Sequence, residues 1–303
     1  MVRHMKQLLL IIYLVLLSSY SYSENLPPDG PYETFHENGQ LEERITFKDG
    51  KQSGVWEVYD KNGQLRGRGT FKDGKKSGVW ESFYENGQLG FRGNYRDGEN
   101  GPVEFFNENG QLQSKGNLKN GKGDGVWEYF NKKGRLERRG NLLDGKTDGV
   151  WEYFDKKGRL ERRGNLLDGY ADGVWEYFYR GEEVWKRATF KNVLLNGLAE
   201  VFYLQTAGGK LARRGNYKDG KTDGIWEFFY ENGQLDKRGT YKEGKEDGIW
   251  EFFYERGPLE MKGNYKDGKE DGVWEYFKES SGRKDTQYFI NGEQVTRKKY
   301  LKK

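Results

Sequence analysis

A 24-residue period in the tryptophans constrains this chain more than any other feature of its sequence. Trp151 lies 24 residues after Trp127 and 24 before Trp175. Eight of the nine tryptophans share this register: Trp56, Trp80, Trp127, Trp151, Trp175, Trp226, Trp250 and Trp274. A fixed period of this length is typical of repeat architectures, in which each unit packs on its neighbours. The length of 303 residues therefore indicates one array rather than two ordinary domains.

The tryptophan position defines eleven repeats, which we place within residues 30–295. Three repeats have another residue at this position: Tyr32, Val103 and Ala199. One residue is missing just before Val103, three are inserted in the loop 204–210, and a half-repeat follows Trp274. Loops and departures from a regular pattern often carry function, and neutral decay of one repeat is the alternative explanation.

Each repeat has the pattern of two strands joined by a tight turn. The first strand is V-W-E followed by two aromatic residues, and the second is L-x-x-R-G-N-Y-K. Asn-Gly between such runs, as in Asn62-Gly63, predicts a two-residue type I′ hairpin loop. Asp-Gly then leads into the next repeat. The sequence thus predicts an all-β fold: a single extended, twisted antiparallel meander of about eleven 24-residue hairpins.

The predicted loop also fixes which residues face each other. A two-residue loop at Asn62-Gly63 sets Trp56 opposite Gly69 and Glu57 opposite Arg68. We therefore expect each indole to cover a bare glycine within its own hairpin, an arrangement known as aromatic rescue. The glycines of this set are Gly69, Gly93, Gly140, Gly164, Gly239 and Gly263. Because strand side chains alternate, one face carries the tryptophans and the other a ladder of Glu and Arg.

The composition is consistent with an aromatic core. Only 34% of the residues are hydrophobic and 33% are charged, values that would otherwise suggest disorder. The aromatic content of 16% indicates a folded chain instead.

The N-terminus has the pattern of a secretory signal peptide. Arg3 and Lys6 precede an apolar run, residues 8–17, and small residues then offer a cleavage site before Glu24. We assign residues 1–23 to a signal peptide, 24–29 to a linker and 296–303 to a basic tail that is expected to fray. Export places the protein in the periplasm, at the cell surface or outside the cell. An uncleaved membrane anchor is the alternative. The absence of cysteine excludes disulfides and lipoprotein processing.

The repeat motif resembles a known family. The pattern G-N-Y-K-D-G-K-x-D-G-x-W-E-x-F-Y-E-N-G, seen from Gly215 to Gly233 and from Gly239 to Gly257, is similar to the variant MORN repeat of bacteria, found in YwqK-type antitoxin components. The resemblance implies protein scaffolding, contact with membranes or phosphoinositides, or a link to polymorphic toxins. The export signal departs from the pattern of a cytoplasmic antitoxin.

The sequence offers little for catalysis. Residues 24–303 contain one histidine, His36, and no cysteine, which argues against His/Cys metal sites and nucleophile–histidine pairs. The Glu after each tryptophan recurs in every regular repeat, whereas a catalytic carboxylate is usually singular. The Asp-Gly-Lys-x-Asp-Gly turns lack the ligand series of a calcium loop. We predict a protein that is not an enzyme and has no cofactor or metal.

Binding of a protein partner is the function that the sequence favours. Removal of residues 1–23 leaves 50 basic and 48 acidic residues, too balanced for nucleic-acid binding. The irregular region supplies candidate partner contacts at Trp185, Val193, Leu194 and Leu195. The alternatives are a glycan, choline or lipid headgroup bound by the aromatic rows, a toxin-neutralising role, and contact of the basic tail with a membrane surface.

Overall fold

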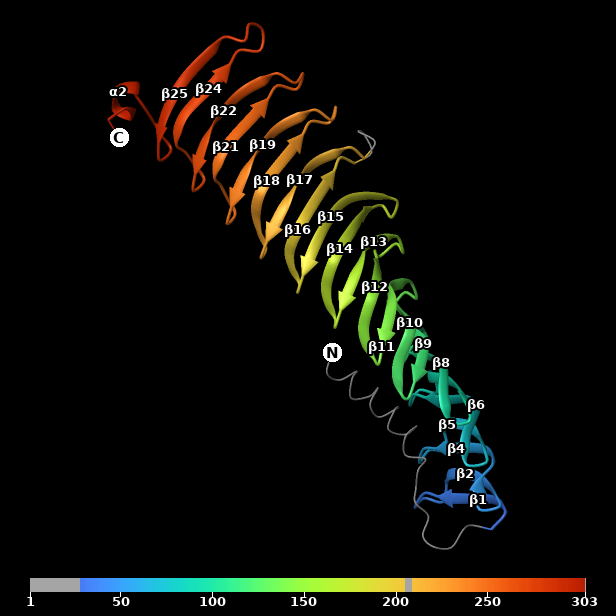
Figure 1. Cartoon of the computed structure of the whole chain (residues 1–303). Helices are drawn as coiled ribbons and strands as arrows, with labels where there is room; N and C mark the ends of the chain where they lie inside the picture. Colours follow the sequence, from blue (N-terminus) through green and yellow to red (C-terminus); the bar gives the residue numbers. More distant parts are fainter. Residues whose placement is uncertain (1–27, 205–208, 303) are drawn as a thin grey trace. The chain divides into compact units, whose positions relative to one another are not determined.

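The computed structural model describes residues 28–204 and 209–302. These residues form 26 strands of one antiparallel sheet and one short helix (Figure 1). The all-β hairpin array predicted from the sequence is confirmed. Residues 1–23 of the signal peptide, and the linker before residue 28, lie outside the described residues. Among the described residues, no helix has the length and apolar character needed to cross a membrane.

The chain divides into two compact units. The first comprises the described residues up to Asp148 together with Lys156–Gly158, and the second comprises Gly149–Asp155 and the described residues from Arg159 on. The strands of the first unit are β1 (Gly30–Phe35), β2 (Leu41–Lys48), β3 (Lys51–Gln52), β4 (Gly54–Tyr59), β5 (Leu65–Lys72), β6 (Lys75–Phe83), β7 (Leu89–Arg96), β8 (Glu99–Phe106), β9 (Leu112–Lys119), β10 (Lys122–Phe130) and β11 (Leu136–Leu143).

Strand β12 (Lys146–Phe154) begins in the first unit and continues into the second. The remaining elements of the second unit are β13 (Leu160–Leu167), β14 (Tyr170–Tyr179), β15 (Glu183–Lys191), β16 (Leu194–Phe202), β17 (Leu211–Lys218), β18 (Lys221–Phe229), β19 (Leu235–Lys242), β20 (Lys245–Glu246), β21 (Gly248–Phe253), β22 (Leu259–Lys266), β23 (Lys269–Glu270), β24 (Gly272–Phe277), β25 (Lys284–Ile290), β26 (Glu293–Val295) and α2 (Arg297–Tyr300). In three repeats the first strand is interrupted, which gives β3/β4, β20/β21 and β23/β24.

The predicted register within each hairpin is confirmed. Trp56 lies opposite Gly69 and Glu57 opposite Arg68 in the β4–β5 pair. The same register recurs in the other regular hairpins, where the Trp/Gly partners are Trp80/Gly93, Trp127/Gly140, Trp151/Gly164, Trp226/Gly239 and Trp250/Gly263. The hydrophobic pattern and the loop length together fix the register, because a slip of one residue would turn every tryptophan to the opposite face.

The turn type predicted at Asn-Gly is wrong. The N–H of Gly63 donates to the carbonyl of Asp60 and the N–H of Asp60 donates to the carbonyl of Gln64, both at 2.9 Å. Gly63 has a φ of 78°, but Asn62 has no positive φ. This is a three-residue loop in which a turn is followed by a left-handed glycine. A register shift between Val58 and Tyr59 then restores the predicted pairing around Trp56.

The two-residue turns lie instead at Asp-Gly, between repeats. Asp73 and Gly74 have φ values of 53° and 79°, as a type I′ turn requires. Asp and Gly suit these positions because glycine has no Cβ and a short polar side chain tolerates the left-handed region. The insertion-prone loop therefore lies within the hairpin, and the tight turn connects neighbouring hairpins.

Val193 departs from this turn chemistry. It follows Asn192 at the position that glycine holds in the other turns between repeats, and its φ is 66° although its side chain is β-branched. Because its side chain is 54% exposed, Val193→Gly removes strain without loss of packing. We expect it to raise the free energy of unfolding by about 1 kcal/mol, measured by urea denaturation. Val174→Gly, equally exposed but within a strand, should lower it by about 1 kcal/mol. Destabilisation by both substitutions would contradict this account.

The indole that covers each glycine comes from the following hairpin, not from the glycine's own hairpin as predicted. A Cβ atom at Gly69 would collide with the indole of Trp80, not with that of Trp56. The same holds for Gly239, which lies under Trp250 although its hairpin partner is Trp226. The prediction that each tryptophan covers a glycine of its own hairpin is therefore wrong. Each covered glycine lies under the tryptophan that follows it by eleven residues, whether or not its partner in its own hairpin is also a tryptophan. The described pairs are Gly69/Trp80, Gly116/Trp127, Gly164/Trp175, Gly215/Trp226, Gly239/Trp250 and Gly263/Trp274.

A recurrent hydrogen bond holds the indole over the preceding hairpin. Nε1 of Trp226 donates to the carbonyl oxygen of Asn216 at 3.0 Å. Trp80, Trp127, Trp175 and Trp250 make the same bond to the residue ten positions earlier, at 3.0–3.2 Å. Trp274 keeps the position, but its Nε1 has no hydrogen-bond partner among the described residues. The tryptophan thus joins consecutive hairpins as well as filling the core.

The irregular repeats follow the same eleven-residue relation. Ile45 holds the glycine position before Trp56, and Nε1 of Trp56 donates instead to Glu43 Oε1 at 2.6 Å. Ala188 is fully buried, and its partner in the next repeat is Ala199 rather than a tryptophan. Ala188 thus has a side chain larger than hydrogen where the next repeat has no indole to lie over it.

Aromatic contacts continue the core from one repeat to the next. Trp80 stacks on Trp56 with ring centres 5.0 Å apart and meets Phe71 edge-on at 4.9 Å. In the second unit, Trp250 meets Tyr241 and Tyr265 edge-on at 5.2 and 6.0 Å. Such offset and edge-on pairs are favourable geometries for aromatic rings. They bury the core of a single sheet without a second layer.

The basic tail is partly ordered, which corrects the expectation that it frays. Residues Arg297–Tyr300 form α2, and the side chain of Thr296 accepts a hydrogen bond from the N–H of Lys299. The ring of Tyr300 packs on that of Tyr288, with centres 5.3 Å apart. This contact places the helix against β25.

Candidate binding surface

A ladder of ion pairs covers the face opposite the tryptophans, and we call this side of the sheet the ladder face. Glu81 lies between two arginines, with Arg68 at 2.6 Å and Arg92 at 3.0 Å. Glu176 is held in the same way by Arg163 and Arg187, at 2.7 and 3.1 Å. Each of these glutamates thus pairs with its own hairpin and with the preceding one. The ladder joins repeats on one face as the tryptophans do on the other.

The paired arginines favour the ionised form of Glu81 and of Glu176. Burial alone would raise the pKa of Glu81, but hydrogen bonds from Arg68 and Arg92 outweigh it and lower the pKa below its ordinary value. Glu176 shows the same balance, and its pKa is also lowered. A carboxylate held ionised by two guanidinium groups is suited to a structural role rather than to proton transfer. No group of three or more potential metal ligands occurs among the described residues.

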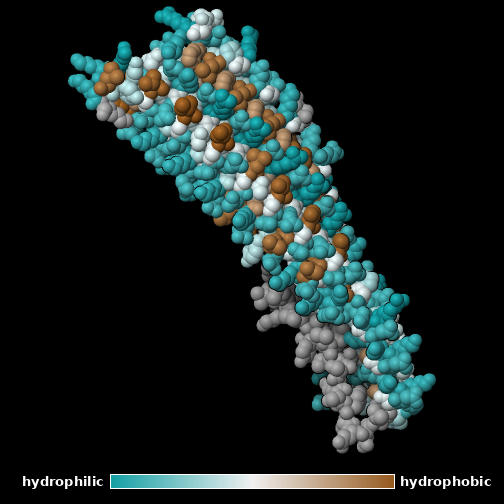
Figure 2. Space-filling model, viewed as in Figure 1, coloured by the Kyte–Doolittle hydropathy of each residue, from teal (hydrophilic) through white to brown (hydrophobic). Residues whose placement is uncertain are grey.

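A row of exposed aliphatic side chains runs beside the ladder, one from each of nine repeats. We call this row the aliphatic stripe. In the first unit it consists of Val55, Val79 and Val126; in the second it consists of Val150, Val174, Leu198, Ile225, Ile249 and Val273. Their exposed fractions run from 40% to 67%. Figure 2 shows apolar side chains recurring at intervals in a largely hydrophilic surface.

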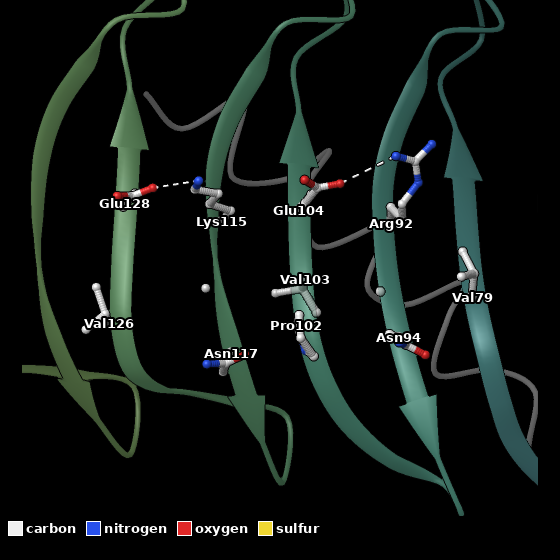
Figure 3. Close-up of a pocket in the computed structure, with 12 residues that line it drawn as sticks. Val79, Arg92, Asn94, Pro102, Val103, Glu104, Lys115, Asn117, Val126 and Glu128 are labelled. Carbon is white, nitrogen blue, oxygen red and sulfur yellow. Dashed lines mark ion pairs between the residues drawn. The ribbon is translucent and has the colours of Figure 1, made fainter.

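The first unit has a hollow of about 490 Å³ on the ladder face (Figure 3). Three sets of side chains from strands β6 to β10 line it, and we call each set a row. The aliphatic row is Val79, Pro102 and Val126; the charged row is Arg92, Glu104, Lys115 and Glu128; and the amide row is Asn94 and Asn117. The aliphatic and amide rows alternate along one line across the strands, because Asn94 lies opposite Val79 and Asn117 opposite Pro102. In the charged row, Arg92 pairs with Glu104 at 3.5 Å and Lys115 with Glu128 at 2.8 Å.

The hollow coincides with the repeat that lacks one residue. In the regular β5–β6 pair, three residues of β6 face one residue of β5 between the Arg68/Glu81 and Thr70/Ser77 partners. In the β7–β8 pair, only two residues of β8 face one residue of β7 between the Gly93/Val103 and Tyr95/Asn100 partners. The deletion shortens the bulge, and Pro102 holds a position where every other repeat except the first, which has Pro31, carries Val, Leu or Ile. The missing residue was the sequence signal for this site, but it predicted no hollow.

The tryptophans predicted from the register are core residues. All eight are between 0% and 6% exposed, so no ligand can reach the faces of their indoles. Burial thus removes the basis for glycan, choline or headgroup binding by the tryptophan rows. The predicted glycines lie in the strands beneath or beside these indoles and offer no functional groups.

The four candidate partner contacts do not form one cluster. Trp185 is half-buried near the start of β15, where its ring meets Tyr177 at 6.2 Å. Val193, Leu194 and Leu195 follow the far end of the same strand, about 20 Å away. Val193 and Leu194 are about half exposed. They form at most a small separate patch at a turn.

Lys76 gives a pH-dependent test of the core. Its Nζ lies 4.4 Å from the ring centre of Trp80, and burial lowers its pKa from 10.5 to about 8. The folded state therefore holds fewer protons than the unfolded state between these pH values, so this group makes the free energy of unfolding rise with pH in that window. We expect Lys76→Met to stabilise the protein at pH 7 by about 2 kcal/mol and to lose this gain as the pH approaches 10.5.

Urea denaturation at several pH values measures this difference. Lys75→Met, at an exposed neighbouring position, is the matched control and should give no pH-dependent gain. A gain from Lys76→Met that stays constant up to pH 10.5 would show that the ammonium group is not desolvated.

The comparison with protein families identifies the repeats. Six segments match the model described as MORN repeat variant, and together they cover less than half of the chain: residues 28–49, 52–73, 76–97, 99–120, 222–243 and 246–267. These six segments are therefore similar to MORN repeats of the variant type. The match says nothing of the antitoxin family that the sequence resembles. No curated protein matches the chain.

Solved structures share only a limited likeness with this protein. One is a point mutant of S. aureus TarM in complex with fondaparinux, alpha-GlcNAc-glycerol and UDP, which is 19% identical with a TM-score of 0.23 over 39% of this chain and 23% of that chain. Another is TarM, 18% identical with a TM-score of 0.22 over 38% of this chain and 24% of that chain. This chain thus spans about a quarter of the length of each.

Proposed function

We propose that this protein is an exported, non-enzymatic scaffold that binds a protein partner through the ladder face of its sheet. The observation that carries the proposal is the aliphatic stripe, because it repeats an apolar side chain at a solvent-exposed position in both units. An isolated exposed valine is common on protein surfaces, but a recurrent apolar row between polar rows is typical of interaction sites.

The neighbouring rows support a protein partner. The ladder supplies paired charges and hydrogen-bonding groups on one side of the stripe, and Asn or Thr side chains lie in the strands between the stripe residues. An apolar centre with a polar rim is the usual composition of a protein–protein interface. The ladder carries both signs of charge in equal measure, which disfavours nucleic acid and anionic lipid.

Substitution of the stripe in the first unit tests this proposal. The protein is used as bait on material from its own source, with chemical cross-linking and mass spectrometry to identify what binds. We expect Val55→Lys, Val79→Lys and Val126→Lys together to abolish capture of the partner, because three charged side chains replace exposed apolar ones without disturbing the core. Leu143→Lys is the control, since it adds a charge off the stripe at a position where most repeats carry lysine. Undiminished capture by the triple variant would contradict the proposal.

Export is a separate part of the proposal, supported by the pattern of residues 1–23. Cleavage before Glu24 predicts a mature protein that lacks these residues. The intact mass of the protein purified from its source, together with cell fractionation, measures both features. A full-length protein in the cytoplasm would overturn export and leave the binding proposal intact.

A further inference from the structure

In the hollow of the first unit, the aliphatic and amide rows alternate along one line across the strands with a fixed spacing. Val79, Pro102 and Val126 lie on β6, β8 and β10, so each is two strands from the next (Figure 3). Neighbouring strands are 4.7–4.9 Å apart, which gives the rows a period of about 9.6 Å across the strands. A ligand that lies along these rows meets the same chemistry at that interval.

We propose that the hollow binds an extended, uncharged, proline-rich segment of the partner in the polyproline II conformation, running across strands β6 to β10. This inference rests on the proposed function and names the chemistry of the partner at one place on the ladder face. An apolar residue at every third position of the segment would contact the aliphatic row.

The period of the ligand matches that of the rows. A polyproline II helix rises about 3.1 Å per residue with three residues per turn, so equivalent side chains recur every 9.3 Å. Over the two intervals from Val79 to Val126 the mismatch with the rows is about 0.6 Å. An α-helix presents its heptad positions every 10.5 Å or so and would drift by about 1.8 Å over the same distance. An α-helix is also about 10–12 Å wide with its side chains, which is too wide to fit well in a hollow of about 490 Å³.

The amide row matches the backbone of such a segment. Polyproline II has no internal hydrogen bonds, so its carbonyl groups need donors from solvent or from a partner. Asn94 and Asn117 are exposed, and their side-chain amides make no hydrogen bond with any described residue. They lie two strands apart, on β7 and β9, with the same period as the aliphatic row. Each can therefore donate to a carbonyl one turn further along the ligand.

The charges of the hollow favour an uncharged ligand. Arg92 and Lys115 are each paired with a glutamate across the neighbouring strand. An anionic ligand would have to displace Glu104 or Glu128, and a cationic one would have to displace Arg92 or Lys115. A proline-rich segment leaves both pairs intact, and its apolar residues cover Val79 and Val126, which are 53% and 62% exposed.

A labelled peptide of four Pro-Pro-Leu triplets is the probe, titrated with the protein and followed by fluorescence polarisation. The control peptide has the same composition with its leucines in one block. We expect saturable binding of the periodic peptide and at least tenfold weaker binding of the block peptide. Asn94→Ala with Asn117→Ala should weaken binding of the periodic peptide at least tenfold, whereas Asn216→Ala, at the same position of a repeat in the second unit, should leave it unchanged.

Equal binding of both peptides, no binding, or no effect of the Asn94/Asn117 variant would overturn the inference. A β-1,4-linked N-acetylglucosamine hexasaccharide is titrated in parallel, and saturable binding of the sugar without the peptide would overturn it in favour of a glycan. If the variant with Val55→Lys, Val79→Lys and Val126→Lys no longer captures the partner, but the peptide does not bind the wild-type protein, the scaffold function stands and only the proline-rich assignment fails. If capture is insensitive to the stripe, the proposed function fails whatever the peptide does.

Discussion

Gly239→Ala is expected to lower the free energy of unfolding by about 3 kcal/mol, a large effect for the addition of one methyl group. A Cβ atom at this position would overlap Cγ, Cδ2 and Cε2 of the Trp250 indole. The indole cannot move away freely, because its Nε1 is bound to the carbonyl of Thr240 at 3.2 Å and its ring packs edge-on against Tyr241 and Tyr265. The substitution therefore strains both the core and the contact between hairpins.

Gly93→Ala is the matched control for this prediction. It holds the same position in its repeat, but the residue ten positions later is Val103 and no indole lies over it. The nearest obstacle to a new Cβ is the end of the Phe91 side chain, which can shift. We expect a loss of about 1 kcal/mol or less. Urea denaturation followed by far-UV circular dichroism measures both variants, and equal losses would show that the indole is not the cause.

Trp250→Ala is expected to cost about 4 kcal/mol, because it removes a side chain that is 2% exposed and leaves a cavity in a single-layered core. The loss extends to both neighbours, since the ring contacts Phe228 and Tyr241 on one side and Phe252 and Tyr265 on the other. In a repeat protein such contacts between neighbours supply much of the stability of each unit.

Trp185→Ala provides the comparison, because Trp185 is the one tryptophan outside the 24-residue register. It is half-buried and its ring contact is with Tyr177, so we expect a loss of about 1 kcal/mol. Denaturation of the two variants under the same conditions tests the difference. A cost at Trp185 equal to that at Trp250 would contradict the role assigned to the register.

Much of the fold could be predicted from the sequence because the same residue pattern recurs in every regular repeat. The alternation of faces, the pairing of Trp56 with Gly69 and the ladder of Glu and Arg were all predictable from strand period and loop length. The error in the turn type did not disturb them. The three-residue loop at Asp60 and Gly63 shifts the register by one, and the bulge beside Tyr59 shifts it back.

The direction of the indole was not predictable from pairing alone. Gly164, for example, lies opposite Trp151 on one neighbouring strand and Trp175 on the other, and strand pairing alone does not tell which indole covers it. Which glycine an indole covers depends on the direction in which the tryptophan side chain points. The hydrogen bond from Trp226 Nε1 to the carbonyl of Asn216 shows that it points toward the preceding hairpin. The sequence did hold a hint: Ile45, Gly93 and Ala188 break the glycine–tryptophan pair at the eleven-residue spacing, and each departs from the regular packing.

The candidate site was less accessible to sequence analysis than the fold. Val or Ile before each regular tryptophan is what strand propensity alone would favour. Only the exposure of these side chains shows that they form a surface row and not part of the core. The composition of the irregular region predicted partner contacts at Trp185 and Val193, but these two residues lie near opposite ends of β15. The hollow arises from a single missing residue, whose effect depends on the bulge in which it falls.

A double-mutant cycle tests the central claim most directly. The cost of Gly239→Ala is measured in the wild-type background, in Trp250→Ala and in Trp226→Ala, using urea denaturation. The account predicts that the cost nearly vanishes when Trp250 is absent, a coupling of about 3 kcal/mol, and persists when Trp226, the partner in its own hairpin, is absent. A cost that persists without Trp250 but disappears without Trp226 would contradict the account, because the indole over Gly239 would then belong to its own hairpin.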